Sequence, residues 1–165
     1  MLHSHELLGF ISPELGNRLL TDSAEDNKEV YEATIAGVAT KRNMRPQFLK
    51  RQPKPKRHQL MLDCLQRPAF EEVAASLLRG WLLHHQSQLL IDFLDALKIE
   101  HKNGEVDDLP TDVTDEELSQ AIDGILAKHD RETVILYLHA FHSMNDAGWT
   151  NLENALTTDE RLQFN

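Results

Sequence analysis

The sequence predicts an all-α protein, and two kinds of observation carry that prediction. Apolar residues recur at helical spacing along most of the 165-residue chain, and residues that favour helix starts precede several of these stretches. The two most apolar stretches, 68–97 and 131–144, have apolar side chains on nearly every side of the expected helix. Such helices belong at the centre of a bundle. We therefore expect an irregular bundle of about seven helices around these two central helices.

The N-terminal part is expected to begin with two helices, the second ending near residue 42. Ser12 suits an N-cap, Pro13 suits the first helical position, and Glu14 is an acid favoured by the helix dipole. These three residues predict a helix over 13–20. A short helix over 58–65 is expected to precede the first central helix.

The C-terminal part of the sequence contains further N-capping signals for helices and one turn signal. Asn103 and Gly104 predict a tight turn, with a tiny β-hairpin near 99–106 as one interpretation. Thr114 to Glu117 form a capping-box pattern that predicts a helix over 115–128, and Asp130 is the expected cap of the second central helix. The same capping-box pattern at Thr150 predicts a last short helix.

A single domain over 1–165 is the expected organisation, because this length suffices for one hydrophobic core. The alternative is an N-terminal helical lobe over 1–44, joined by a basic, proline-rich connector over 45–57 to a main bundle over 58–165. Pro46, Pro53 and Pro55 are half of the six prolines of the chain. Since proline fixes φ and lacks a backbone donor, they predict an extended stretch over 51–57.

The positive charge of the chain is concentrated in one segment. The net charge is −10, yet residues 41–58 contain no Asp or Glu. Charge segregation of this kind is typical of a contact surface. Eight of the 17 Lys and Arg lie in this segment, and they are the candidate partner-binding residues: Lys41, Arg42, Arg45, Lys50, Arg51, Lys54, Lys56 and Arg57.

Three interpretations of this segment remain open. It is a solvated loop that pairs with the acidic run at 105–117, or it binds an acidic surface of another protein or of a second copy in a homodimer, or it binds the phosphate backbone of nucleic acid. Nucleic acid is not favoured, because Phe48 is the nearest aromatic side chain and no stacking platform is evident. We expect a non-enzymatic interaction module that binds an acidic protein surface or a second copy.

A metal-dependent enzyme is the alternative from another class. Histidines lie on both expected central helices, and His139, His142 and Asp146 follow one another at helical spacing. Together with His84 and His85 they would form a His and carboxylate site of the kind that zinc or non-haem iron uses. Partly buried histidines bound to neighbouring polar groups are the simpler interpretation, so no cofactor is predicted.

Several other classes lack their sequence signals. Cys64 is the only cysteine, which rules out an intrachain disulfide and favours a reducing, cytoplasmic location. The most apolar stretch, 81–97, is interrupted by polar and charged residues that exclude a membrane segment, among them His84, His85, Gln86, Gln88, Asp92 and Asp95. The seven glycines form no phosphate-binding loop.

Overall fold

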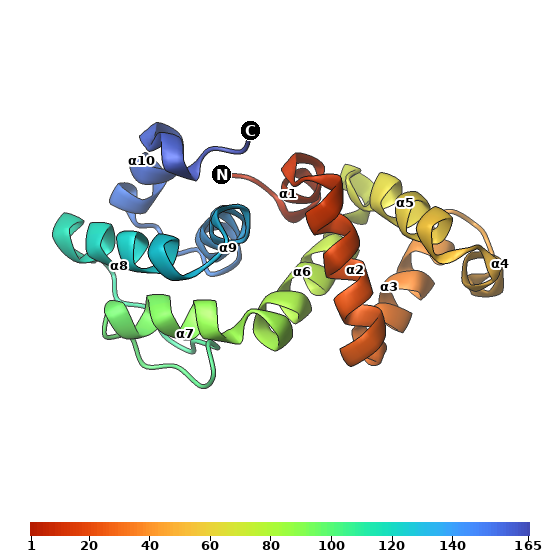
Figure 1. Cartoon of the computed structure of the whole chain (residues 1–165), viewed down its shortest axis with the longest axis horizontal. Helices are drawn as coiled ribbons and strands as arrows, with labels where there is room; N and C mark the ends of the chain where they lie inside the picture. The colour runs from red at the N-terminus through yellow and green to blue at the C-terminus, as the bar shows by residue number, and fades with distance from the viewer. The chain divides into compact units, whose positions relative to one another are not determined.

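A computed structural model describes residues 1–165, and all of its regular secondary structure is helical (Figure 1). The all-α prediction is confirmed. Ten α-helices and two short 3-10 helices take the place of the seven expected helices. Three α-helices are additional: α1 (Ser4–Phe10), α4 (Pro46–Arg51) and α7 (Ser87–Ala96), the last being the second part of the expected helix over 68–97. Two prolines that were expected to interrupt the chain lie at helix starts. Pro46 is the first residue of α4, and Pro55 lies in the first turn of α5, where a missing backbone donor costs nothing. The extended connector predicted over 51–57 is therefore wrong.

The chain divides into two compact units, which we call the first unit (His3–His84) and the second unit (Met1, Leu2 and His85–Asn165). The alternative organisation had placed a lobe boundary in the connector over 45–57. In the structure, α5 (Lys54–Leu65) packs against α2 (Pro13–Asp26) and α3 (Lys28–Lys41), so residues on both sides of that connector belong to the first unit. The N-terminal lobe is thus larger than the sequence suggested.

In the first unit, the buried side chain of Trp81 links α6 (Glu71–His85) to α2. The indole is fully buried, and its Nε1 donates a hydrogen bond of 3.0 Å to Asp22 Oδ2. The Arg18 guanidinium carbon lies 5.9 Å from the centre of the same ring. The elements of this unit are α1 (Ser4–Phe10), α2 (Pro13–Asp26), α3 (Lys28–Lys41), α4 (Pro46–Arg51), α5 (Lys54–Leu65), η1 (Pro68–Phe70) and α6 (Glu71–His85).

The second unit is built around an aromatic cluster. The Phe93 ring lies 5.5 Å from Tyr137 and 5.4 Å from Phe141, and Phe141 lies 5.4 Å from Trp149. Edge-to-face and tilted ring pairs of this kind add to the stability gained from burial alone. The elements of this unit are α7 (Ser87–Ala96), α8 (Asp115–Lys128), α9 (Arg131–Met144), α10 (Thr150–Thr158) and η2 (Glu160–Leu162).

The helix predicted over 68–97 is not continuous. A 3-10 turn at η1 precedes α6, and a bend at Gln86, with φ −119° and ψ 24°, separates α6 from α7. The bend falls in a run of polar residues, His84 to Gln88, that interrupts the apolar pattern. The single long central helix is therefore wrong, and its two halves belong mainly to different units.

Three predicted helix caps are present, and one is not. Ser12 Oγ accepts from the Leu15 amide, Thr114 and Glu117 form the reciprocal capping box, and Asp130 accepts from the Thr133 amide. The capping box at Thr150 is wrong, because Trp149 occupies the cap position and Thr150 is already helical.

The predicted hairpin near 99–106 does not form. Asn103 and Gly104 make the tight turn, with φ values of 52° and 95°, but the only pairing is one isolated bridge between Lys102 and Glu105. Two such short strands would have no sheet face to bury, and they would be marginal alone.

Candidate functional site

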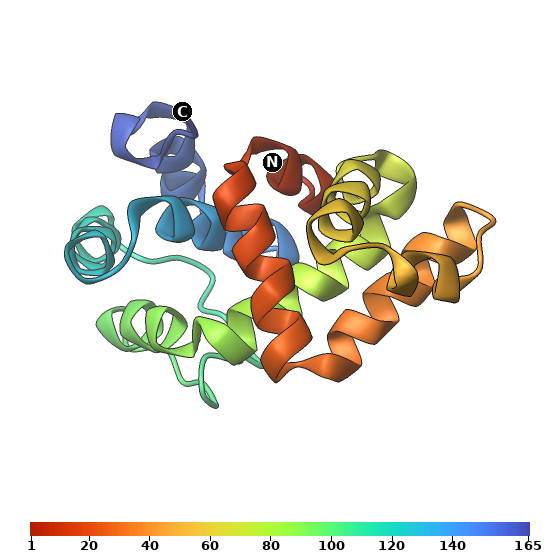
Figure 2. The same ribbon diagram turned by 45° about the vertical axis from the view of Figure 1, so that its right-hand side comes forward.

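Segment 41–58 runs from the end of α3 through α4 to the start of α5, within the first unit (Figure 2). Its eight basic residues lie at the end of α3, in the turn before α4, on α4 and in the first turn of α5. We call this the basic surface. Lys50 pairs with Glu32, and Arg57 Nη1 donates a hydrogen bond of 3.1 Å to the Lys50 carbonyl. The other six side chains are exposed and form no ion pair or hydrogen bond within the protein: Lys41, Arg42, Arg45, Arg51, Lys54 and Lys56.

Helix α4 presents an aromatic side chain in the middle of the basic surface. Leu49 is fully buried and anchors α4, which packs against α3. Phe48 is 52% exposed. Phe48 and Arg51 are three positions apart in α4 and are therefore neighbours on its surface, and Arg45 is the exposed N-cap residue of this helix. The surface therefore combines an apolar ring with positive charge.

The first turn of α5 is positively charged, although negative charge is favoured at the start of a helix. Lys54, Lys56 and Arg57 lie there, with no acid among them, and Pro53 offers no capping side chain. Free backbone amides make a helix N-terminus electropositive, so cations at this end raise its potential further. Negative charge from outside the protein would relieve this repulsion.

A buried hydrogen-bond chain supports the base of this surface. His58 Nδ1 lies 3.2 Å from Asn17 Oδ1, and His58 Nε2 lies 2.8 Å from the Tyr31 hydroxyl. The Arg57 guanidinium carbon lies 5.9 Å from the centre of the Tyr31 ring. Burial, followed by the positive charges of Arg57 and Lys54, lowers the pKa of His58 from 6.5 to about 4. His58 is therefore neutral near pH 7 and adds no charge to the surface.

A groove of about 840 Å³ runs between α1, α2 and α5 of the first unit. We call it the α5 groove. Its lining includes apolar surface from Ile11, Pro13 and Leu62, and Lys54 of the basic surface and Asp63 also line it. The groove thus adjoins the basic surface at the start of α5.

Thr21 lines the α5 groove with a hydroxyl that is buried and has no hydrogen-bond partner. An orphaned buried hydroxyl costs about 1–3 kcal/mol. We expect Thr21→Val, which keeps the shape of the side chain, to raise the free energy of unfolding by roughly 1 kcal/mol. Urea unfolding followed by circular dichroism measures this change. A loss of stability instead would mean that the hydroxyl is satisfied in solution.

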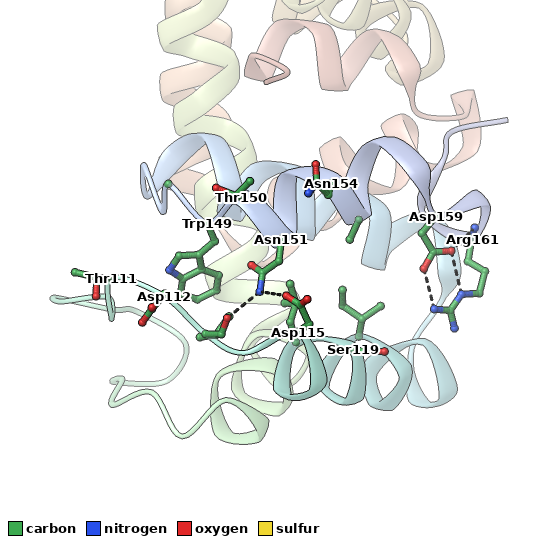
Figure 3. Close-up of a pocket in the computed structure, with 15 residues that line it drawn as sticks. Thr111, Asp112, Asp115, Ser119, Trp149, Thr150, Asn151, Asn154, Asp159 and Arg161 are labelled. Carbon is green, nitrogen blue, oxygen red and sulfur yellow. Dashed lines mark hydrogen bonds and ion pairs between the residues drawn. The ribbon is translucent and has the colours of Figure 1, made fainter.

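The second unit has a smaller groove of about 560 Å³ between α8, α10 and the loop before α8 (Figure 3). Asn151 Nδ2 donates hydrogen bonds to the Val113 carbonyl and to Asp115 Oδ1, at 2.8 and 3.1 Å. Arg161 is paired with Asp159 and Asp123, each at 2.8 Å. These polar groups already bind one another, so they hold the loop and the C-terminal turn in place rather than present a binding site.

The structure gives no support to the predicted metal site. No group of three or more His, Cys, Asp or Glu side chains is placed to hold a metal ion. His84 belongs to the first unit, whereas His85, His139, His142 and Asp146 belong to the second. His142 is buried, but Asp146 is exposed in the turn after α9 with a φ of 47°.

His139 packs against the C-terminal tail of the protein. Its ring stacks on Phe164, with 5.4 Å between ring centres. Burial lowers the pKa of His139 from 6.5 to about 4, although a hydrogen bond involving the Leu162 backbone acts in the opposite direction. His139 is therefore a neutral imidazole near pH 7 that packs on the C-terminal tail.

The sequence missed the α5 groove. Its lining comes from three helices that are separated by up to some fifty residues along the chain, and no local pattern shows that they meet. Phe48 stood out in the sequence only as the lone aromatic near the basic residues. Its exposure depends on how α4 packs, which a single sequence does not indicate.

No protein-family model, no curated protein and no solved structure matches this chain. No helix is both long enough and apolar enough to cross a membrane. The function must therefore be inferred from the residues and their geometry.

Proposed function

We propose that the protein is a non-enzymatic interaction module whose basic surface binds an acidic surface of another protein. The observation that carries this proposal is the set of six exposed Lys and Arg side chains without any ion pair in the protein itself. Complementary charge steers association and gives specificity to a protein interface.

The character of the surface supports a protein partner over nucleic acid. Phe48 supplies an exposed apolar ring, and interfaces are enriched in such aromatic side chains together with Arg. Single strands are usually bound by several aromatic rings along a groove, and the basic surface offers only one. The net charge of −10 also opposes general attraction to polyanions.

Charge reversal at the basic surface tests this proposal. We expect the quadruple variant Arg45→Glu, Arg51→Glu, Lys54→Glu and Lys56→Glu, which changes only exposed bases without an ion pair in the protein, to lose a protein partner that the wild-type protein retains from a cell lysate. The loss follows because four attractive contacts become repulsive. Nuclease treatment should leave retention by the wild-type protein unchanged.

The matched control reverses four exposed basic residues elsewhere, Lys28, Arg67, Lys98 and Lys128, with the same change in net charge. This variant should keep the partner. Equal retention by all three proteins would contradict the proposal, and loss on nuclease treatment would favour nucleic acid instead. If the retained partner is the protein itself, light scattering at increasing concentration will show a dimer that the quadruple variant does not form.

A further inference from the structure

We propose that the partner binds with an apolar side chain in the α5 groove and with its carboxylates on the adjoining basic surface. The inference rests on the proposed function and specifies the partner: a protein segment that carries an apolar residue next to a cluster of Asp or Glu. The observation behind this inference is that the α5 groove and the basic surface adjoin each other within the first unit.

The groove and the basic surface share residues. Lys54 lines the groove and is also one of the exposed bases, and Pro55 lies beside it in the first turn of α5. A partner segment that lies in the groove can therefore place its carboxylates next to Lys54 at the start of α5. Apolar contact along Ile11, Pro13 and Leu62 then favours burial of an apolar side chain.

The charges along the groove also set the direction of the partner segment. Lys54 and Asp63 both line the groove and are nine positions apart in α5. This spacing corresponds to about 13 Å along the helix axis. Carboxylates are favoured near Lys54 and disfavoured near Asp63. The apolar residue of the partner should therefore lie between an acidic end and a neutral or basic end.

The gain from such an arrangement is specificity. Exposed charge pairs contribute little individually, and they would attract many acidic surfaces alike. An apolar side chain that is buried in a groove contributes more. The combination selects acidic segments that also present an apolar residue at the correct distance.

Peptide selection on the whole protein tests this inference. Random 12-residue peptides displayed on phage are enriched on the wild-type protein, and the enriched peptides are then synthesised with a fluorophore. We expect these peptides to contain Asp or Glu next to an apolar position. Fluorescence anisotropy then compares binding to the wild type, to Gln59→Trp and to the control Gln120→Trp.

Gln59 is exposed on α5 and lines the groove, so a tryptophan there should obstruct it without disturbing the core. Gln120 is exposed on α8 in the second unit and lies outside the grooves described above. We expect Gln59→Trp to weaken binding at least tenfold and Gln120→Trp to leave it unchanged. Replacement of the apolar peptide residue by Ser should weaken binding to the wild type equally and should add little in Gln59→Trp.

The outcomes separate the two proposals. If the quadruple charge variant abolishes binding but neither Gln59→Trp nor the Ser peptide changes it, the proposed function stands and the groove inference is overturned. If neither charge reversal nor Gln59→Trp matters, or if no acidic peptide is enriched, both are overturned. Methyl chemical shifts of Ile11 and Leu62 provide a test without any variant, because a bound peptide must shift them if it occupies the groove.

Discussion

Replacement of Trp81 by Ala is expected to lower the free energy of unfolding of the first unit by about 3–5 kcal/mol. Trp81 is fully buried in α6, and its indole Nε1 binds Asp22 on α2. Truncation to Ala removes the apolar contacts of the ring and leaves a cavity, because surrounding helices relax only partly. Urea unfolding followed by circular dichroism measures the loss.

The control is Trp81→Phe, which keeps much of the buried apolar area but removes the donor to Asp22. Its expected cost is smaller, roughly 1–2 kcal/mol, because Asp22 is only partly buried and can bind water. If Trp81→Phe were as harmful as Trp81→Ala, the hydrogen bond rather than packing would be the main contribution of this residue.

The second large effect is a loss of stability in mild acid. His58 and His139 each have a pKa lowered by burial to about 4 in the folded protein, against 6.5 ordinarily. Below pH 6.5 the unfolded chain binds protons at these residues and the folded chain does not. Stability is therefore complete above pH 6.5 and falls as the pH decreases toward 4, by at most about 3 kcal/mol for each histidine.

The free energy of unfolding, measured between pH 7 and pH 4, checks this expectation. His58→Gln retains an amide that can bind Asn17 and Tyr31 but does not titrate, so it should remove about half of the slope. Carboxylates affect the stability at a lower pH than these histidines do. Hydrogen bonds from His5 and Ser4 hold the pKa of Glu71 below its usual value in spite of burial, so its contribution is lost only at lower pH. An unchanged slope in both His58→Gln and His139→Gln would contradict the account.

Local signals in the sequence predicted local structure well. The caps at Ser12, Thr114 and Asp130 form as expected because each bond joins residues only three positions apart. Pro46 and Pro55 were misinterpreted because proline favours both an extended chain and the start of a helix. For Pro46, the helix is favoured by packing of α4 on α3 and by burial of Leu49, which lies in the same helix.

Tertiary features could not be predicted from one sequence. The bend at Gln86 assigns most of the expected helix over 68–85 to the first unit and its continuation over 87–96 to the second. The polar run from His84 to Gln88 was the only sequence signal of this break, and polar residues also occur within continuous helices. The α5 groove likewise requires α1 and α2 to meet α5. The basic surface was predictable as a run of residues, because its charge is contiguous in the chain.

Photo-crosslinking at Phe48 tests the central claim most directly. Phe48 is replaced by p-benzoylphenylalanine, a similar aromatic residue at an exposed position between Arg45 and Arg51, and the same group at Gln120 serves as the control. After irradiation in cells, mass spectrometry identifies the crosslinked peptide. The account predicts a protein partner crosslinked from position 48 but not from 120, through a peptide rich in Asp and Glu. Identical products from both positions, or crosslinks mainly to nucleic acid, would contradict it.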